Sequence, residues 1–422
     1  MNNLASKAFH LSTCPGPESL FETPSMLRRA AILLVLAVAH ATTAGDDWPH
    51  WRGPNRNGIS TERLPENLRK PLPALWKAEV GVGFSSFSVV GNRTLTMGHA
   101  GGRDTVWCLD IQTGKTLWKH SYECELHPRF YEGGPGGTPT IHEESVFTLS
   151  KRGHAFRFDL ETGDVIWSRD LLADHGLELP EWNFACSPFI DEELVLLNAG
   201  GGGMALSRET GGTVWLSDSN PSGYATPVAF EAPGTTHLLH THRALIGFDS
   251  RSGKEAWRFE GLSGLNAADP VVDGRRFFLS TKAGTICLEL DRDGKPIEVW
   301  KQRNLRWYFN AGVLIDGHLY SLSGTTHRPT QLLCSDAKTG ESVWSEEGFR
   351  TGGLIAASGQ VILLDQGKLT IFAASPEGFS PRLQQQVLGG KCWTAPVLAN
   401  GRIFCRNAEG SVVALGVAQP AR

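Results

Sequence analysis

Apolar and polar positions alternate in a repeating block along the chain, and the block is clearest over residues 138–169. Four short runs rich in apolar and β-branched residues follow one another at 138–141, 145–150, 155–159 and 165–169. Turn-forming and charged residues, such as Thr162-Gly163, separate the runs. Short runs with such boundaries are typical of β-strands joined by hairpins. The pattern predicts a four-stranded antiparallel unit, and no long helical pattern interrupts it.

A tryptophan marks the last strand of most blocks. The positions are Trp76, Trp118, Trp167, Trp215, Trp257, Trp300 and Trp344, at intervals of 42 to 49 residues. The phrase L-D-x-x-T-G-K-x-x-W at 109–118 recurs in related form at 158–167, 248–257 and 335–344, with weaker copies at 207–215 and 290–300. An aspartate can accept hydrogen bonds from backbone amides two residues on, and glycine tolerates positive φ. D-x-x-T-G therefore predicts a tight turn between two strands.

The number of blocks predicts the fold class. Inner strands are expected around Phe87, Thr138, Pro188, Pro227, Pro270, Gly312, Leu354 and Pro396. A four-stranded blade cannot bury both of its faces alone, so repeated blades stack on one another in a ring. We predict an all-β, eight-bladed β-propeller in which the repeat tryptophans pack between blades. The last blade lacks an outer strand and residues 74–80 form an outer strand without a blade, so we expect the chain ends to pair and close the ring.

This repeat accounts for the length of 422 residues, which would otherwise suggest two domains. We expect one propeller domain over residues 45–422 and an N-terminal extension over residues 1–44. The 48 glycines and 23 prolines suit many short strands joined by turns. The net charge is −4, and basic residues alternate with acidic ones. This distribution lacks the basic patch that nucleic acid or an anionic membrane surface would require.

The N-terminal extension has the layout of a secretory signal peptide near residues 26–44. Arg28 and Arg29 precede the apolar run 30–39, and small residues follow at positions 39, 41 and 44. We expect translation to begin at Met26 and the mature protein to be periplasmic or secreted. The apolar run is too short to span a bilayer.

The cysteines are predicted to be small buried residues. Cys14 precedes the signal peptide, which leaves seven cysteines in the expected mature chain. Cys108 and Cys334 each stand two residues before a repeat aspartate, and Cys287 holds a similar strand position. Disulfide pairing is the alternative. The sequence contains no CxxC, no CxxCH for attached haem and no cysteine and histidine cluster with zinc spacing.

The phrase L-D-x-x-T-G-K-x-x-W closely resembles the tryptophan-docking repeat of pyrroloquinoline quinone (PQQ)-type propellers. Two groups share this repeat: the quinoprotein alcohol dehydrogenases and the non-catalytic propeller of the outer-membrane protein assembly machinery. The segments 48–55 (WPHWRGPN) and 391–397 (KCWTAPV) also resemble uncharacterised secreted bacterial propellers, which are often described as polyvinyl-alcohol-dehydrogenase-like. The resemblance covers nearly everything after the signal peptide and implies the fold.

A dehydrogenase resemblance would imply PQQ, a calcium ion held by a carboxylate and an amide, an aspartate base, an aromatic floor and often two adjacent cysteines. No cysteines are adjacent here. Glu132 and the segment Glu181-Trp182-Asn183 supply carboxylates and an amide, but they match no dehydrogenase motif residue by residue. We therefore assign no catalytic residue.

Other candidate metal-binding residues have simpler structural interpretations. Asp291 and Asp293 lie at the repeat's turn and lack the rest of a calcium loop. His240 and His242 are expected on one face of a strand, where they form a polar surface or, with a third ligand, a metal site. No third ligand is identifiable, so no metal site is predicted.

The segments that lead into the inner strands are rich in aromatic, amide and charged side chains. The candidate binding residues at this rim are Tyr131, Glu132, Glu181, Trp182, Asn183, Tyr224, Asn266, Trp307, Tyr308, Asn310, Arg350, Lys391 and Trp393. Rigid aromatic rings beside hydrogen-bonding groups suit a binding surface. The alternative is that these residues fill the channel mouth.

These patterns favour a monomeric binding scaffold of the bacterial cell envelope that presents its rim to a protein or a small-molecule ligand. The alternative is a PQQ- and calcium-dependent alcohol dehydrogenase of the polyvinyl-alcohol type. Such an enzyme would need a separate electron acceptor because no haem motif is present. Scaffold features are abundant in the sequence and site features are few, so binding is the preferred interpretation.

Overall fold

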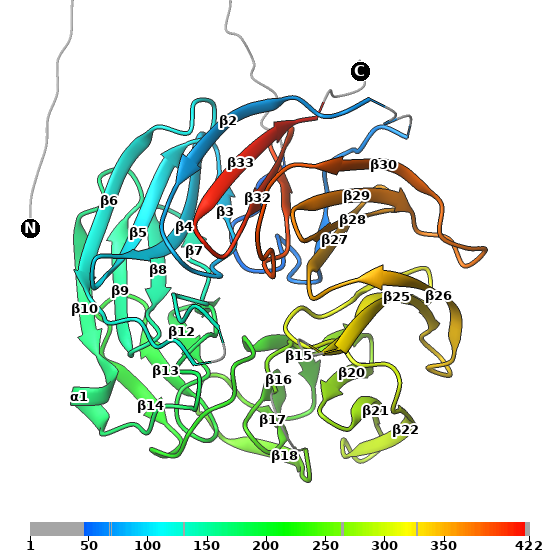
Figure 1. The fold of residues 1–422 in the computed structure, drawn as a ribbon. Coiled ribbons are helices and arrows are strands. Elements are labelled where there is room, and N and C mark those ends of the chain that lie inside the picture. The colour runs from blue at the N-terminus through cyan, green and yellow to red at the C-terminus, as the bar shows by residue number, and fades with distance from the viewer. Residues whose placement is uncertain are drawn as a thin grey trace, which may run out of the picture. The chain divides into compact units, whose positions relative to one another are not determined.

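The computed structural model describes residues 46–417 except residues 67, 69, 130, 263–265 and 326–327. Residues 44–422 group as one compact unit. The described part contains eight sheets, almost entirely antiparallel, and one short helix, α1 (Leu171–His175). The predicted eight-bladed β-propeller is therefore confirmed (Figure 1). The predicted signal peptide and Cys14 lie outside the described residues.

The first four blades each consist of four consecutive strands. Blade 1 contains β3 (Ser88–Val90), β4 (Arg93–Ala100), β5 (Arg103–Asp110) and β6 (Thr116–Glu123). Blade 2 contains β7 (Thr140–His142), β8 (Ser145–Leu149), β9 (His154–Asp159) and β10 (Val165–Asp170). Blade 3 contains β11 (Phe189–Asp191), β12 (Leu194–Leu197), β13 (Met204–Ser207) and β14 (Thr213–Leu216). Blade 4 contains β15 (Val228–Ala232), β16 (Thr235–His240), β17 (Leu245–Phe248) and β18 (Glu255–Phe259).

The next three blades follow the same order, and the last is completed from the N-terminal side of the chain. Blade 5 contains β19 (Val271–Asp273), β20 (Arg276–Thr281), β21 (Gly284–Leu290) and β22 (Pro296–Gln302). Blade 6 contains β23 (Val313–Ile315), β24 (His318–Thr325), β25 (Arg328–Asp336) and β26 (Ser342–Phe349). Blade 7 contains β27 (Gly353–Ala357), β28 (Gln360–Asp365), β29 (Lys368–Ala373) and β30 (Pro381–Gln386). Blade 8 contains β31 (Val397–Ala399), β32 (Arg402–Arg406), β33 (Ser411–Gly416) and β2 (Ala74–Glu79).

Ring closure follows the prediction from the unpaired outer strand. β2 pairs antiparallel with β33, and Trp76 lies opposite Ala414. Figure 1 shows the blue β2 beside the red β33, so the two ends of the domain share one blade. In addition, β1 (Ile59–Ser60) pairs in parallel with β27 and adds a fifth strand to the sheet of blade 7.

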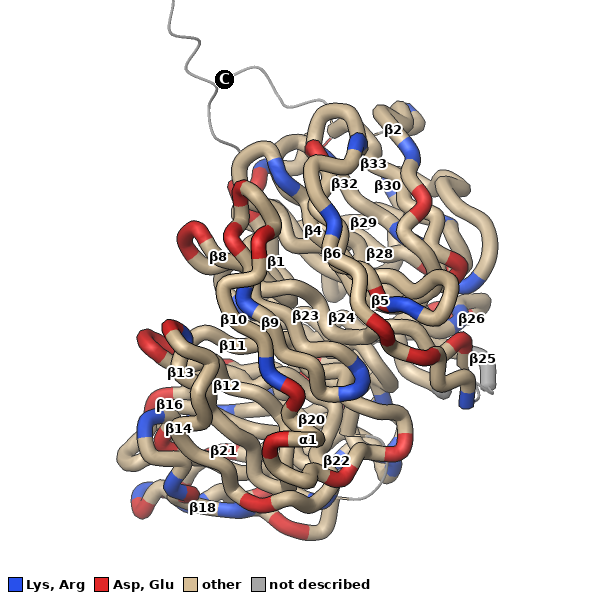
Figure 2. Tube along the Cα trace, turned by 90° about the vertical axis from the view of Figure 1, so that its left-hand side faces the viewer, with Lys and Arg blue, Asp and Glu red and all other residues tan. Residues whose placement is uncertain are grey.

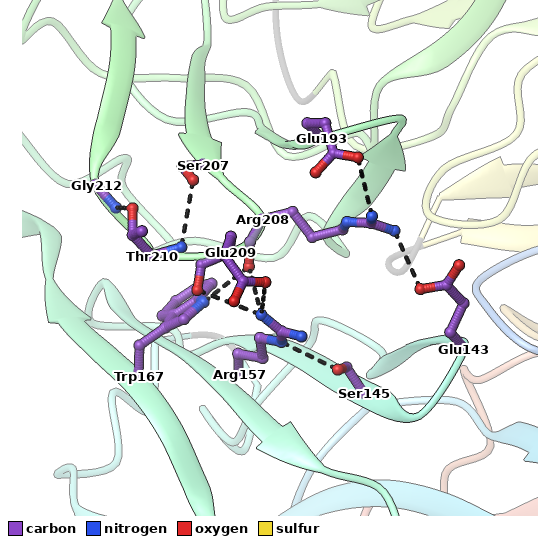
Figure 3. Close-up of polar contacts among 10 residues, drawn as sticks. All are labelled: Glu143, Ser145, Arg157, Trp167, Glu193, Ser207, Arg208, Glu209, Thr210 and Gly212. Carbon is purple, nitrogen blue, oxygen red and sulfur yellow. Dashed lines mark hydrogen bonds and ion pairs between the residues drawn. The ribbon is translucent and has the colours of Figure 1, made fainter. Parts of the chain in front are cut away.

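All but one of the repeat tryptophans dock on the turn of the following blade, as Trp167 illustrates (Figure 3). Its Nε1 donates a hydrogen bond of 2.9 Å to the carbonyl oxygen of Arg208. Its ring covers Gly211, where an added Cβ would lie 2.7 Å from ring carbons and where φ is +69°. A glycine at this turn position therefore serves both the backbone conformation and the close approach of the indole.

The same docking bond recurs around the ring. The donor and acceptor residues are Trp76 and Ile111, Trp118 and Leu160, Trp215 and Ser250, Trp300 and Ala337, and Trp344 and Ser375. The turn chemistry is also as predicted, because the Asp110 carboxylate accepts hydrogen bonds from the amides of Gln112 and Thr113. These tryptophans are packing residues between blades.

Trp257 is the exception. The turn of the next blade contains two extra residues after Gly294, and no atom lies within 4 Å of a Cβ built on that glycine. The buried Trp257 Nε1 has no hydrogen-bond partner, and its ring stacks on Phe277 at a centroid distance of 5.7 Å. Asp291 and Gly294 are three positions apart, whereas Asp110 and Gly114 are four apart, so this turn differs from the docking turn. The Trp257 ring therefore contacts the next blade by stacking, without the docking hydrogen bond.

Charged side chains reinforce the junction of blades 2 and 3 at the surface. Arg208 reaches both Glu143 and Glu193, and Arg157 pairs with Glu209 at 2.8 Å (Figure 3). Exposed pairs of this kind contribute about 1 kcal/mol or less each. Figure 2 shows basic and acidic residues interspersed along the chain, in agreement with the absence of a basic patch in the sequence. No helix in the described residues is long and apolar enough to cross a membrane.

The cysteines behave as predicted. All seven cysteines in the described residues are buried and free. Cys108, Cys287 and Cys334 each lie directly across from a docking tryptophan on the neighbouring strand. A small side chain at this position leaves room for the indole.

The expectation that His240 and His242 share a strand face is wrong. β16 ends at His240, whose side chain is buried and whose Nδ1 lies 3.3 Å from the carbonyl oxygen of Ala268. His242 lies in the following turn and is exposed. The turn breaks the alternation that would have placed the two rings together.

Three histidines with lowered pKa values make the propeller sensitive to acid. Burial lowers the pKa of His50 to about 3 and the pKa values of His237 and His240 to about 4. In the unfolded chain these groups titrate near 6.5, so between pH 6.5 and about 4 the unfolded state binds more protons. The free energy of unfolding should fall by about 1 kcal/mol per pH unit for each histidine in that window.

Urea unfolding at pH 7.5, 6 and 5 would measure this slope. His240→Gln should reduce the slope of unfolding free energy against pH by about 1 kcal/mol per pH unit, the contribution of one histidine. This reduction is expected whatever the variant's stability at pH 7.5. An unchanged slope in this variant would show that His240 is not held neutral by burial.

Candidate functional site

An N-terminal segment, residues 48–60, crosses the centre of the ring and closes it. The backbone of Trp48 pairs with Val89 of blade 1, and the carbonyl oxygen of Pro49 accepts a hydrogen bond from Ile141 of blade 2. On the other side, Arg52 donates to the carbonyl oxygens of Ala311 and Gly312 next to β23. A segment that binds inner strands on opposite sides of the ring forms a plug, which we call the N-terminal plug.

A cavity of about 340 Å³ lies against the plug, where the connections into the inner strands gather. Its aromatic lining comprises Trp51, Phe84, Tyr131, Trp182, Phe184, Tyr224, Tyr308, Phe309 and Trp393. Its polar lining includes Arg129, Ser187, Thr226, Asp269, Asn310 and Thr394. This composition, aromatic walls with a few polar groups, is typical of small-molecule sites.

The structure brings six of the predicted rim residues into this cavity. They are Tyr131, Trp182, Tyr224, Tyr308, Asn310 and Trp393. Three more lie in ion pairs near it. Lys391 pairs with Glu132 at 2.7 Å and also lies 4.4 Å from the centroid of the Trp393 ring. Glu181 pairs with Arg129 at 2.9 Å.

The other four predicted residues lie elsewhere. Asn183 is buried with a φ of +63°, and the buried amide of Asn266 donates to the carbonyl oxygens of residues 241 and 242. Trp307 belongs to a hydrophobic cluster between blades 5 and 6. Arg350 is exposed and does not line the cavity. For Trp307 the structure favours packing over an open binding surface.

The polar residues at the base of the cavity were not predicted from the sequence, although their position before the inner strands could have identified them. The amide of Thr138 donates to the Ser187 hydroxyl, the Ser187 amide to the Thr226 hydroxyl, and the Thr226 amide to the Asp269 carboxylate. Each of these residues stands two positions before an inner strand. Aligning the inner strands would have shown Asp269 as an acid in a series of hydroxyl residues.

Asp269 is buried and has charged neighbours. Its Oδ2 accepts a hydrogen bond of 2.5 Å from Trp51 Nε1. Burial raises the pKa of this carboxyl, and the positive charges of Arg52 and Arg56 oppose that shift. Burial also lowers the pKa of Arg56 to about 9. The carboxylate charge is thus compensated by two guanidinium groups beneath the cavity.

The residues present do not fit the calcium ion of a quinoprotein dehydrogenase. The part of the chain that the structure describes contains no group of three or more His, Cys, Asp or Glu side chains that could hold a metal. Asp269 is the one carboxylate in the cavity lining, and two buried guanidinium groups near it would repel a divalent cation.

Comparisons with known proteins agree on the architecture. A family model described as outer membrane protein assembly factor BamB matches residues 74–204 and 102–346. Outer membrane protein assembly factor BamB of Yersinia pestis is 23% identical over 298 residues, which cover 64% of this chain and 72% of that protein.

Two solved structures share the fold at low sequence identity. BamB from Moraxella catarrhalis superposes with a TM-score of 0.63 at 14% identity, covering 84% of this chain and 100% of that chain. Quinohemoprotein alcohol dehydrogenase from Comamonas testosteroni superposes with a TM-score of 0.65 at 14% identity, covering 89% of this chain and 81% of that chain. An assembly factor and an alcohol dehydrogenase thus share this fold, so the side chains of the site must distinguish their functions.

Proposed function

The chain belongs to the PQQ-like β-propeller family represented by outer membrane protein assembly factor BamB, and we propose that it is a binding scaffold of the cell envelope whose ligand enters the aromatic cavity. The observation that carries this proposal is the cavity itself, a ring of aromatic side chains above a plugged channel. Its walls come from connections of several blades, so the closed propeller holds them in place before any ligand arrives. Preorganised aromatic side chains lose little conformational entropy on binding.

The proposed location rests on the predicted signal peptide and on the envelope role named in the relative's description. Export would yield a mature chain that begins after Ala41 or Ala44, which N-terminal sequencing would identify. We propose a monomer, in which no second copy is needed to complete the cavity.

Two tryptophans separate binding from folding. Trp393 lines the cavity, where its ring stacks on Phe84 at 5.5 Å and contacts Phe309 at 5.0 Å. Trp393→Ala should weaken ligand capture by about 2 kcal/mol or more and leave the fold nearly intact. Trp167→Ala should instead lower the free energy of unfolding by about 3 to 5 kcal/mol, because Trp167 docks between blades.

Affinity capture from envelope extracts, together with thermal unfolding of each variant, would test this pair. A titration of the purified protein with PQQ and calcium tests the dehydrogenase alternative. We expect no saturable binding of PQQ in this titration. Equal stability losses in the two variants, with no change in any captured species, would make the cavity aromatics packing residues. Saturable binding of the quinone with calcium would favour the dehydrogenase alternative.

A further inference from the structure

We infer that the ligand of the aromatic cavity is a neutral saccharide of one or two residues. This inference rests on the proposed binding function and adds the chemical class of the ligand. It follows from three features of the cavity: the placement of its rings, the hydrogen-bonding capacity of its polar base, and the pairing of its charges.

The rings form two walls. On one side, Tyr131, Phe84, Trp393, Phe309 and Tyr308 follow one another at centroid distances of 4.5 to 5.5 Å. On the other side, Trp182 and Tyr224 lie 5.9 Å apart. The face of an aromatic ring is negative, and the C–H groups on one face of a sugar ring carry partial positive charge. The faces of aromatic rings in the cavity lining therefore suit the C–H faces of a saccharide.

Hydrogen bonds between side chains and the backbone hold these rings in place. Tyr131 Oη donates to the carbonyl oxygen of Trp182 at 3.3 Å, and the Trp182 amide donates to Tyr224 Oη at 3.4 Å. Asn310 donates to the carbonyl oxygens of Gly352 and Trp393 at 3.0 and 2.6 Å. The rings therefore keep their spacing before a ligand binds.

The polar groups at the cavity offer both donors and acceptors. The hydroxyls of Ser187 and Thr226 each accept a backbone N–H, which leaves their own hydrogens for an acceptor in the cavity. Asn310 uses its amide nitrogen on two carbonyls, so its Oδ1 is left to accept. The Asp269 carboxylate has further lone pairs beyond the two bonds that it accepts. Hydroxyl groups donate and accept at once and match this mixture.

Each charged side chain that lines the cavity has an opposite charge nearby. Lys391 pairs with Glu132, Arg129 pairs with Glu181, and Asp269 lies near Arg52 and Arg56. A charged ligand would have to break one of these arrangements or remain uncompensated in a largely aromatic site. A volume of about 340 Å³ is near the lower end of ligand cavities, which suits one or two sugar residues.

Isothermal titration of the purified propeller with neutral disaccharides would test this inference. The panel holds the α- and β-linked disaccharides of glucose, galactose, mannose and xylose, with glucuronic acid and glucosamine as charged probes. At least one neutral disaccharide should bind saturably and at least tenfold more tightly than either charged probe. Trp182→Ala and Trp393→Ala should each weaken that binding at least tenfold. Val214→Ala, which changes an exposed apolar residue of β14, should leave it unchanged.

The outcomes separate the ligand class from the binding function. If no neutral disaccharide binds but capture of an envelope component still depends on Trp393, the saccharide inference fails and the binding function stands. If charged probes bind as tightly as neutral ones, the argument from paired charges is overturned. If neither titration nor Trp393-dependent capture gives a signal, both the inference and the proposed function fail.

Discussion

Gly163→Val should lower the free energy of unfolding by about 4 kcal/mol and loosen the junction between blades 1 and 2. Gly163 has a φ of +76°, and a Cβ built there lies 2.5 Å from a ring carbon of Trp118. That indole is held by a 2.9 Å hydrogen bond from its Nε1 to the carbonyl oxygen of Leu160, so it cannot move aside without losing the bond. Backbone strain and overpacking therefore add.

Gly101→Val is the matched control. Gly101 has a φ of +58°, but no atom lies within 4 Å of a Cβ built there. The control should carry the backbone strain alone, about 1 kcal/mol. Urea unfolding of both variants measures the difference. Equal losses would show that the indole does not restrict this turn.

A double variant isolates the contact itself. Trp118→Ala removes the ring that the new side chain would meet, so Gly163→Val should cost less in that background than in the parent protein. Strict additivity of the two changes would mean that the glycine is required for its backbone conformation only.

Deleting residues 74–80 should have the largest effect, a loss of about 5 kcal/mol or more together with aggregation. These residues include β2, whose antiparallel pairing with β33 completes blade 8. The deletion leaves the polar backbone groups along one side of β33 unpaired. It also removes Trp76, which docks on the turn at Gly114 and donates to the carbonyl oxygen of Ile111.

A second variant controls for the shortened connection. Replacing residues 74–80 by a Gly-Ser linker of the same length keeps the reach between the N-terminal plug and β3. It removes the side chains of β2 that pack on the propeller, including Trp76. Thermal unfolding and light scattering should show the same loss for the linker variant. If both variants melt at the temperature of the parent protein, closure through β2 contributes nothing to stability.

The sequence by itself determined the repeat, the number of blades and the outer strand left without a blade, because each of these patterns depends on residues close together in the chain. The turn at 110–114 is an example. The Asp110 carboxylate accepts hydrogen bonds from the amides of residues 112 and 113, and Gly114 adopts positive φ, so five residues contain the whole turn. Counting the inner strands predicted eight blades and left 74–80 as the outer strand without a blade.

The sequence also predicted part of the candidate site. Position before an inner strand was enough to select Trp182 and Trp393, because connections of this kind meet at one end of a propeller. It was not enough to separate them from Trp307, which stands at an equivalent place but is buried between blades 5 and 6. Side-chain direction in an irregular connection depends on contacts from other blades, which no local pattern records.

Only the tertiary structure decided what the cavity can bind. Trp51 meets Asp269 across 218 positions of sequence, and Asn310 donates to the backbone of Trp393 across 83. Arg52 lies close enough to compensate Asp269 because the plug crosses the ring. The charge and the polar base of the site arise from residues that only ring closure brings together, whereas strands and turns form from neighbours. For that physical reason the fold could be predicted from the sequence, whereas the chemistry of the ligand could not.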